Sequence, residues 1–283
     1  PGFFLFLFER DTNTKQKAFF GELSYDITDK ISATIGGRYF EYERKISTDS
    51  NFAGSIFDVD GDESDNSLKV NISWTPDEET LIYGQWSEGY RLGKPQLKPN
   101  PAFCDIDNDG LVDGLGFAAP DATESDTSEN FELGIRKSFA DDRASLSATI
   151  YRVNWDGMPV GISPPCGFGF ALNAGRARSE GVELELRTIL SENVRLDITT
   201  SYGESKLKED IPLSSDFGSD GDNLPGSADF NVSLGLEYLF SFAGHNMLAR
   251  ADYSYVGDYY HNFSETGQPS GGYSQLNLKG SLD

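Results

Sequence analysis

The feature that most constrains this chain is a regular alternation of short turns and long loops between long strands of period-two hydrophobicity. The stretch from Ser128 to Tyr202 shows the plan, with four such strands joined in pairs by tight polar turns around Asp141 and Glu192. Strict alternation of apolar and polar residues is the pattern of a strand with one apolar face. The chain is therefore expected to be all-β.

The rest of the chain repeats this plan and brings the expectation to about twelve strands. The further expected strands cover Phe3–Phe8, Lys15–Ile27, Ile31–Lys45, Leu68–Thr75, Thr80–Tyr90, Phe230–Phe240, Met247–Val256 and Gly272–Asp283. Short turns are expected near residues 29, 77, 141, 192 and 244. Long loops are expected over residues 47–66, 91–127, 156–168, 209–226 and 259–271.

This arrangement predicts an antiparallel transmembrane β-barrel. The strands run about 10–15 residues against about 5–6 in ordinary sheets, and outer-membrane barrels have short periplasmic turns and long extracellular loops. Two faces are expected along each strand, one toward lipid (Val194, Leu196 and Ile198) and one toward a wet lumen (Arg195, Asp197 and Thr199). Because every backbone group in hydrocarbon must be paired, the sheet is expected to close with strands beyond this chain.

Composition agrees with such a wall and narrows the partners. Only 37% of residues are hydrophobic while 13% are aromatic, which suits strands that are half apolar. No stretch approaches the ~18 apolar residues of a transmembrane helix, but a spanning strand needs only about 9–11 residues. The net charge of −23 argues against nucleic acid as a partner. It is interpreted either as solubility or as acidic loops that bind cations.

The start of the chain, PGFFLFLFERD, has neither a basic region nor a small-residue cleavage site. It reads as the middle of a strand. We therefore expect the chain to be a fragment of a longer protein.

Several pieces resemble the C-terminal barrel of TonB-dependent outer-membrane receptors, in the order that the family has them. They are FGELSYDITDKISATIGGRYFEYER (20–44), ETLIYGQWSEGYRLGKPQ (79–96), SENFELGIRKSFADDRASLSATIYRVNWDGM (128–158), LNAGRARSEGVELELRTILSENVRLDITTSYGESKL (172–207), DNLPGSADFNVSLGLEY (222–238) and ARADYSYVGDYY (249–260). Each piece is weakly specific, and the series, about half of the chain, carries the resemblance.

The resemblance implies a 22-stranded barrel in the outer membrane of a Gram-negative bacterium, closed by an N-terminal plug. It implies import of a scarce ligand, of siderophore, cobalamin or oligosaccharide type, with energy from the TonB complex. Outer-membrane lipid and lipopolysaccharide are implied as surroundings. The plug, its TonB-contacting segment and the final strands are expected to lie outside residues 1–283, all of which are assigned to the barrel. The alternative is a passive porin or a surface adhesin.

One strand breaks the pattern. Its apolar residues change parity after Ile150, since Tyr151, Val153 and Trp155 follow on the opposite face. A β-bulge near the rim or an aromatic girdle explains the change. A lumenal aromatic contact with substrate is the less favoured interpretation.

The sequence CDIDNDGLVDG (104–114) carries the sharpest local motif. Its oxygen donors match positions 1, 3, 5, 7 and 9 of a calcium loop, with glycine at position 6: Asp105, Asp107, Asp109, the Leu111 carbonyl and Asp113. Gly116 stands where the bidentate glutamate is wanted. A structural Ca²⁺ and a solvated acidic loop both remain open; no other cofactor is expected. Asp58, Asp60 and Asp62 form a poorer copy of the motif.

Cys104 and Cys166 both fall in expected extracellular loops. Two cysteines in an exported protein most simply pair, so a disulfide is predicted between the 91–127 and 156–168 loops. Metal binding by two lone cysteines is the weaker alternative.

Loop residues give the candidates for ligand contact. Aromatic side chains at loop tips stack on ligands or belong to the interfacial girdle, and the girdle is favoured for Tyr259 and Tyr260. Cations after the strand ending at Tyr90 attract anions or solvate the surface. The candidate ligand-binding residues are Arg91, Lys94, Phe103, Phe168 and Phe170.

No catalytic arrangement stands out. His245 lies in a short turn and His261 in a long loop, neither with a nucleophile at motif spacing, and there is no GxSxG. The protein is therefore not expected to be an enzyme.

Overall fold

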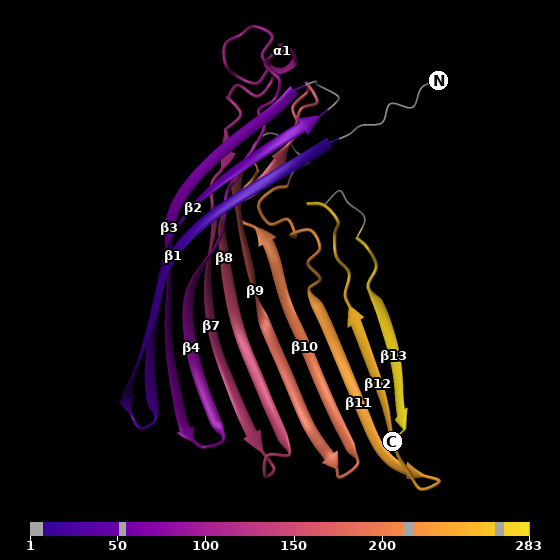
Figure 1. The fold of residues 1–283 in the computed structure, drawn as a ribbon. Coiled ribbons are helices and arrows are strands. Elements are labelled where there is room, and N and C mark those ends of the chain that lie inside the picture. The colour runs from indigo at the N-terminus through magenta and orange to yellow at the C-terminus, as the bar shows by residue number, and fades with distance from the viewer. Residues whose placement is uncertain (1–7, 51–54, 212–217, 264–268, 283) are drawn as a thin grey trace.

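The computed structural model describes residues 8–50, 55–211, 218–263 and 269–282, and strands make up nearly all of it (Figure 1). Eleven strands form one sheet in which the spatial order is the chain order, and every neighbouring pair is antiparallel. They are β1 (Phe8–Thr28), β2 (Ile31–Ser50), β3 (Ser55–Asp77), β4 (Thr80–Arg91), β7 (Asp126–Phe139), β8 (Ala144–Ile162), β9 (Phe170–Ser191), β10 (Val194–Leu207), β11 (Phe230–Phe242), β12 (His245–Val256) and β13 (Tyr273–Leu282).

The predicted all-β antiparallel fold is thus confirmed. The sheet curves and is open, with β1 and β13 at its edges, so the described residues form a section of a barrel wall (Figure 1). The expected total of 22 strands is not tested by this section. The first expected strand, Phe3–Phe8, lies outside the described residues except for its last residue, and this accounts for eleven strands instead of twelve. Among the described residues, no helix is both long and apolar enough to cross a membrane.

All five predicted short turns are present, and they lie together at the lower end of the sheet in Figure 1. The first is closed by Thr28, whose hydroxyl accepts the backbone N–H groups of Lys30 and Ile31 at 3.2 and 3.0 Å. In the last, Ala243 and Gly244 have φ of 52° and 81°. Positive φ at both central residues is the geometry of a type I′ hairpin, whose twist matches that of the strands.

Two of the predicted long loops are wrong, because strands extend into them. Residues 47–50 and 55–66 form the ends of β2 and β3, in continuous register from Ser47↔Asp58 to Tyr39↔Asn66. The aspartates of this part of β3 are typical of loops, although the partly buried Val59, Gly61 and Glu63 alternate with the exposed Asp58, Asp60 and Asp62. Backbone pairing with β2 maintains it, together with side-chain contacts such as that of Glu63 with Ser125. Likewise β8 continues to Ile162 and β9 starts at Phe170, which leaves a connection of residues 163–169.

The extended ends of β1, β2 and β3 form what we call the arm: residues 8–18, 40–50 and 55–66. The ladder between β3 and β4 ends at Lys69↔Ser87, so β3 continues upward without β4 beside it. In Figure 1 the arm leans across the upper end of the sheet. Phe40 is fully buried there and stacks on Tyr90 of β4, with ring centroids 3.8 Å apart.

The two faces of the sheet differ as predicted. Leu196 and Ile198 of β10 pair directly with Leu236 and Leu234 of β11, and residues opposite each other share a face. This face keeps its large apolar side chains exposed, among them Leu23, Ile35, Ile72, Leu133, Ile150 and Leu278. An exposed apolar band around a sheet is the expected surface toward lipid.

The opposite face is polar, and its charges are paired where β10, β11 and β12 adjoin. Arg250 lies 2.8 Å from Asp252, 3.2 Å from Asp197 and 3.7 Å from Glu237. Arg195 also reaches Glu237, at 3.4 Å. This network spans β10 to β12, and it matches the polar inner side of a barrel wall.

Neither of the two favoured explanations, a β-bulge or an aromatic girdle, accounts for the parity change in β8. Register is continuous from Ile150↔Val182 to Trp155↔Ala177, and the irregularities come later, at Met158 and Pro159. A bulge therefore does not produce the change. Trp155 pairs with Ser128 and belongs to the polar face. This is the face on which the less favoured interpretation, a lumenal aromatic residue, places it.

Candidate functional site

The connection from β4 to β7 folds into a compact platform at the loop end of the sheet. It contains a short antiparallel pair, β5 (Lys94–Pro95) with β6 (Ala122–Thr123), and the single turn of helix α1 (Pro101–Cys104). Asn100 caps α1 by accepting the backbone N–H of Ala102 at 3.0 Å. Figure 1 places α1 at the extreme upper end, opposite the five short turns.

The predicted disulfide is confirmed and lies at the centre of the platform. Cys104 and Cys166 are joined, with Cα atoms 5.3 Å apart and a separation of 62 positions in sequence. Closing a chain segment of this length stabilises the folded state by about 4 kcal/mol in the chain-entropy treatment. The bond therefore fixes the platform to the β8–β9 connection.

Apolar side chains bury around this disulfide. The cluster comprises Cys104, Val112, Ala119, Ile162 and Phe170, with Leu115, Phe117, Cys166 and Leu172 packed against it. A second cluster, of Met158, Val160, Leu207 and Ile211, lies where β8 meets the end of β10. The best-buried apolar side chains thus gather at the loop end, while the sheet keeps its apolar side chains outside.

Two amides tie the platform to β9. The side chain of Gln96 donates to the carbonyl of Ala171 and accepts the N–H of the same residue, each at 2.8 Å. Asn173 accepts the N–H of Glu124 at 2.8 Å and donates to the carbonyl of Glu124 at 2.9 Å. Both amides use donor and acceptor together, so the platform is positioned like an added strand.

A buried carboxylate lies where the platform rejoins the wall. The side chain of Asp126 is 3% exposed and forms a bidentate pair with Arg91, at 3.0 Å to Nε and 2.8 Å to Nη2. Trp155 Nε1 donates to Asp126 Oδ2 at 2.5 Å, and the Arg91 guanidinium lies 5.2 Å from the Trp155 ring. These three residues connect β4, β7 and β8.

A second carboxylate joins the arm to the same place. Glu63 accepts the backbone N–H of Ser125 at 3.0 Å and its hydroxyl at 2.8 Å, and it accepts the Tyr42 hydroxyl at 2.9 Å. Burial, and then the hydrogen bond and negative charge of Glu63, raise the pKa of the Tyr42 phenol to about 12. Arg44 adds a contact by donating to the carbonyl of Gly93 at 3.1 Å.

Between the arm and the platform lies a cavity of about 580 Å³. Three cations from three different segments line it, Arg10, Arg91 and Lys94, and none of its described lining residues is acidic. Apolar surface comes from Ile46, Val59, Leu92, Pro95, Leu97 and Pro159. This size and mixture are those of a site for a small ligand, and the charge is unusual in a chain of net charge −23.

The structure separates the five candidate ligand residues into three groups. Arg91 and Lys94 line the cavity, and Arg91 also holds Asp126. Phe103 and Phe168 stack on each other at 5.8 Å between centroids and are 59% and 40% exposed, on the surface beside the disulfide. Phe170 is 6% exposed inside the disulfide cluster, edge-on to Phe117, so its side chain packs the platform.

Tyr259 and Tyr260, for which the girdle was favoured, lie between β12 and β13 at the loop end. The backbone of Tyr259 bridges to Ser270, and the carbonyl of Tyr260 accepts the N–H of Gly226 at 2.7 Å. Both side chains are partly buried.

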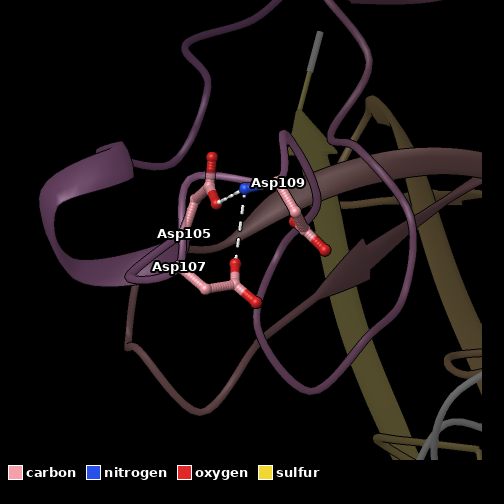
Figure 2. Close-up of side chains that lie close together, drawn as sticks. All are labelled: Asp105, Asp107 and Asp109. Atoms are coloured by element: carbon pink, nitrogen blue, oxygen red, sulfur yellow. Dashed lines mark hydrogen bonds between the residues drawn. The ribbon is translucent and has the colours of Figure 1, made fainter.

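The acidic loop after α1 gathers three of its carboxylates. Oxygens of Asp105, Asp107 and Asp109 lie within 4.8 Å of one another (Figure 2). Asp105 accepts the N–H of Asp109 at 2.9 Å, and Asp109 accepts the N–H of Leu111 at 2.8 Å.

Asp113 is held apart by accepting the N–H of Ile106 at 3.0 Å. Asn108 and Gly110 take the positive φ values, 57° and 85°, that the tight turn needs. The poorer copy at Asp58, Asp60 and Asp62 lies on the paired strand β3, so it forms no loop and the motif there is wrong.

Several residues of this site carry no signal in the sequence. Glu63 and Asp126 are ordinary polar residues of expected loops, and Gln96 is one of many loop amides. Only Trp155 stands out in the sequence, because it falls on the opposite face of its strand from the apolar residues up to Ile150. Each acts by a contact with a residue at least 29 positions away, as in Trp155 to Asp126 and Glu63 to Ser125.

Comparison with known proteins gives a consistent result. The sequence model of the family described as TonB dependent receptor-like, beta-barrel, matches residues 2–283. A curated relative, the pesticin receptor of Yersinia enterocolitica, is 22% identical over 204 residues, which are 71% of this chain and 28% of the relative.

Solved structures agree. The ferric yersiniabactin uptake receptor FyuA of Yersinia pestis superposes with a TM-score of 0.76 at 18% identity, over 97% of this chain and 39% of that one. The siderophore receptor PiuA of Acinetobacter baumannii gives 0.72 at 17%, over 96% and 37%. The copper transporter OprC gives 0.69 at 17%, over 95% and 40%. The chain therefore spans less than half the length of each of these proteins.

Proposed function

The chain belongs to the TonB-dependent receptor-like β-barrel family, and on that premise we propose that it forms wall and extracellular loops of a receptor that binds a small metal chelate and imports it with energy from TonB. Barrels of this family lie in the outer membrane of Gram-negative bacteria. The short turns then face the periplasm, and the arm and the platform face the outside. The family is one of receptors and transporters and not of enzymes.

The observation that supports a chelate as the ligand is the cavity between arm and platform. Chelators hold metals such as Fe³⁺ through anionic oxygens on a partly apolar frame. Guanidinium and ammonium groups bind such oxygens by charge-assisted hydrogen bonds. Arg10, Arg91 and Lys94 supply these groups, and the apolar lining residues fit the frame. The names of FyuA and PiuA, a ferric yersiniabactin uptake receptor and a siderophore receptor, agree with this chemistry.

Lys94→Gln in the full-length protein tests the assignment, since Lys94 lines the cavity and forms no ion pair among the described residues. The probes are ferric yersiniabactin, ferric preacinetobactin and a cupric salt, and binding is followed by quenching of tryptophan fluorescence. Whichever of these probes the unmodified protein binds, we expect Lys94→Gln to bind it about tenfold more weakly, which is the contribution of one charge-assisted contact.

The matched control is Lys98→Gln. Lys98 pairs with Asp121 at 2.7 Å outside the cavity, so this variant is expected to bind as the unmodified protein does. Equal affinities of the unmodified protein, Lys94→Gln and Lys98→Gln would show that the cavity does not bind the chelate. If the protein instead binds a neutral oligosaccharide, and Lys94→Gln does not change that affinity, the ligand is a sugar and not a chelate.

A structural cation in the acidic loop is a second part of the proposal. Three converging carboxylates, with glycine at the sharp turn, form the start of a Ca²⁺ site. The Leu111 carbonyl would add a ligand, and Asp113 would add another by exchanging its hydrogen bond from Ile106 for the ion. The role proposed for the ion is to brace the loop beside the disulfide.

A further inference from the structure

Arg91, a cation of the cavity between arm and platform, already binds a carboxylate of the protein itself. Its Nε atom donates to Oδ1 of Asp126 at 3.0 Å, and its Nη2 atom donates to Oδ2 at 2.8 Å. Two parallel charge-assisted hydrogen bonds of this kind are the strongest contact that a guanidinium makes with a carboxylate. An anionic ligand that reaches Arg91 therefore competes with an internal anion.

The two partners of this ion pair differ in what they expose. The Arg91 side chain is 58% exposed, whereas the Asp126 side chain is 3% exposed. Arg91 lines the cavity, and Asp126 is not among the residues that line it. Because Asp126 occupies Nε and Nη2, the Nη1 atom is left for a ligand. An anion in the cavity thus meets a cation whose charge is partly cancelled by a hidden carboxylate.

Asp126 is fixed in its place behind Arg91. Trp155 Nε1 donates to its Oδ2 at 2.5 Å, and the backbone of Asp126 pairs with Arg91 itself at the end of the ladder between β4 and β7. The preceding residue, Ser125, is held by Glu63 of the arm. A carboxylate with three donors and a paired backbone stays in position when a ligand arrives, so its charge acts on the bound ligand.

We propose that Asp126 limits the affinity of the cavity for anionic ligands and thereby keeps a captured ligand releasable. The inference rests on the proposed function, because it concerns the same cavity and the same class of ligand. A site on a transport path must bind its ligand firmly enough to capture it and weakly enough to let it leave. Arg91 serves the capture, and the carboxylate behind it serves the release.

The size of this effect follows from the geometry of a guanidinium. A ligand oxygen at Nη1 and a carboxylate at the Nε–Nη2 edge lie on opposite sides of the group, about 6–8 Å apart. The repulsion between unit charges at this distance lowers an affinity by about tenfold or more near a protein surface. Glu63 adds a further negative charge nearby, but it is present in every variant considered below.

The opposite role for Asp126 would be to position Arg91 for the ligand, and it predicts the opposite sign. If orientation depended on the carboxylate, its removal would release the guanidinium and weaken binding. Two features argue against this dependence. The Trp155 ring lies 5.2 Å from the guanidinium and does not need Asp126 to stay there. In Asp126→Asn, moreover, an amide oxygen remains to accept the N–H of Arg91 Nε.

The test measures binding to the full-length protein and to Asp126→Asn. The probes are pyrenetetrasulfonate, a fluorescent anion on an apolar frame, and the chelates ferric yersiniabactin and ferric preacinetobactin. We expect Asp126→Asn to bind these anions about tenfold more tightly. Asp126→Glu keeps the charge and is expected to show no gain. Asp121→Asn is the matched control, since it removes an acidic side chain of the platform that is 84% exposed and lies outside the cavity.

Equal or weaker binding by Asp126→Asn would overturn the affinity-limiting role and leave the proposed function intact. Absence of binding of every probe, by the unmodified protein and by Asp126→Asn alike, would overturn both. Damage to the fold lowers affinity, so a gain in Asp126→Asn cannot arise from it. A heat-modifiable band on gels verifies folding. If Asp126→Asn does not fold, Asp126→Ser, which also removes the charge and keeps an acceptor, takes its place with the same expected gain, and no gain would again overturn the role.

Discussion

Glu63 and Ser125 are 62 residues apart in sequence, and the carboxylate of Glu63 accepts both the backbone N–H and the hydroxyl of Ser125. This contact joins the arm to the residue before β7. The neighbouring residue, Asp126, is held in turn by Arg91 and Trp155. Two adjacent residues thus fix the arm, the platform and the wall together around the cationic cavity.

Removing the Glu63 carboxylate is expected to release the arm. In Glu63→Ala the N–H and hydroxyl of Ser125 lose their acceptor, at a cost of about 1–3 kcal/mol. Hydrogen exchange should accelerate in residues 40–48 and 58–66 and stay unchanged in β10–β13. Glu41→Ala, on the opposite face of the arm, is the control. Equal exchange in both variants would show that the contact does not hold the arm.

The Tyr42 phenol predicts how the arm responds to alkali. Its pKa is raised from 10.0 to about 12, mainly by burial and then by Glu63, so the folded state favours the protonated phenol. The resulting stability is fully present below pH 10 and is lost as pH rises toward 12. The difference in tyrosinate absorbance between the unmodified protein and Tyr42→Phe measures this. A phenol that titrates near its ordinary pKa would contradict the burial.

Trp155→Phe isolates one hydrogen bond at the buried carboxylate. The ring remains beside Arg91, while Asp126 loses one of its three donors. We expect a loss of about 1–2 kcal/mol in the unfolding of the platform. Arg91→Ala is expected to cost more, because it leaves the carboxylate buried without its counter-charge. The reverse order, measured by thermal unfolding in detergent, would mean that Trp155 and not the ion pair fixes the site.

Most strand positions and the turns were accessible from the sequence because they depend on local chemistry, and the disulfide was accessible because the chain has only two cysteines to pair. Alternating side chains marked the apolar band, and polar turn residues such as Asp141 marked the short hairpins. The outer ends of β2 and β3 were missed because four aspartates fall between residues 58 and 65, a composition typical of loops, whereas in the structure these residues pair in register with β2.

The site itself was less predictable. Arg91 and Lys94 were chosen for their charge and do line one cavity. The acceptors that fix this region, Glu63 and Asp126, depend on contacts between distant segments that no local pattern encodes. Phe170 looked like its neighbour Phe168, but the fold buries one and exposes the other.

The disulfide is expected to stabilise the platform by about 4 kcal/mol. Cys104→Ser/Cys166→Ser should speed hydrogen exchange over residues 92–125 and leave the sheet unchanged. The same variant should weaken chelate binding, since Lys94 lies on the platform. Unchanged exchange over residues 92–125 would show that the apolar cluster alone holds the platform.

Calorimetry with Ca²⁺ tests the acidic loop. Asp107→Ala removes one converging carboxylate and is expected to abolish the heat of binding. Asp121→Ala, an acidic residue of the same platform outside the cluster, is the control and should bind as before. Equal heats of Ca²⁺ binding for the unmodified protein and Asp107→Ala would show that the segment is a solvated acidic loop and not a calcium site.

The most direct test of the central claim is uptake by whole cells of the chelate that binds tightest, carried out with and without a functional TonB system. The account predicts that uptake requires TonB and stops when the proton gradient is dissipated. Uptake that persists without TonB, together with steady ion conductance of the purified protein in planar bilayers, would contradict it and identify a passive pore.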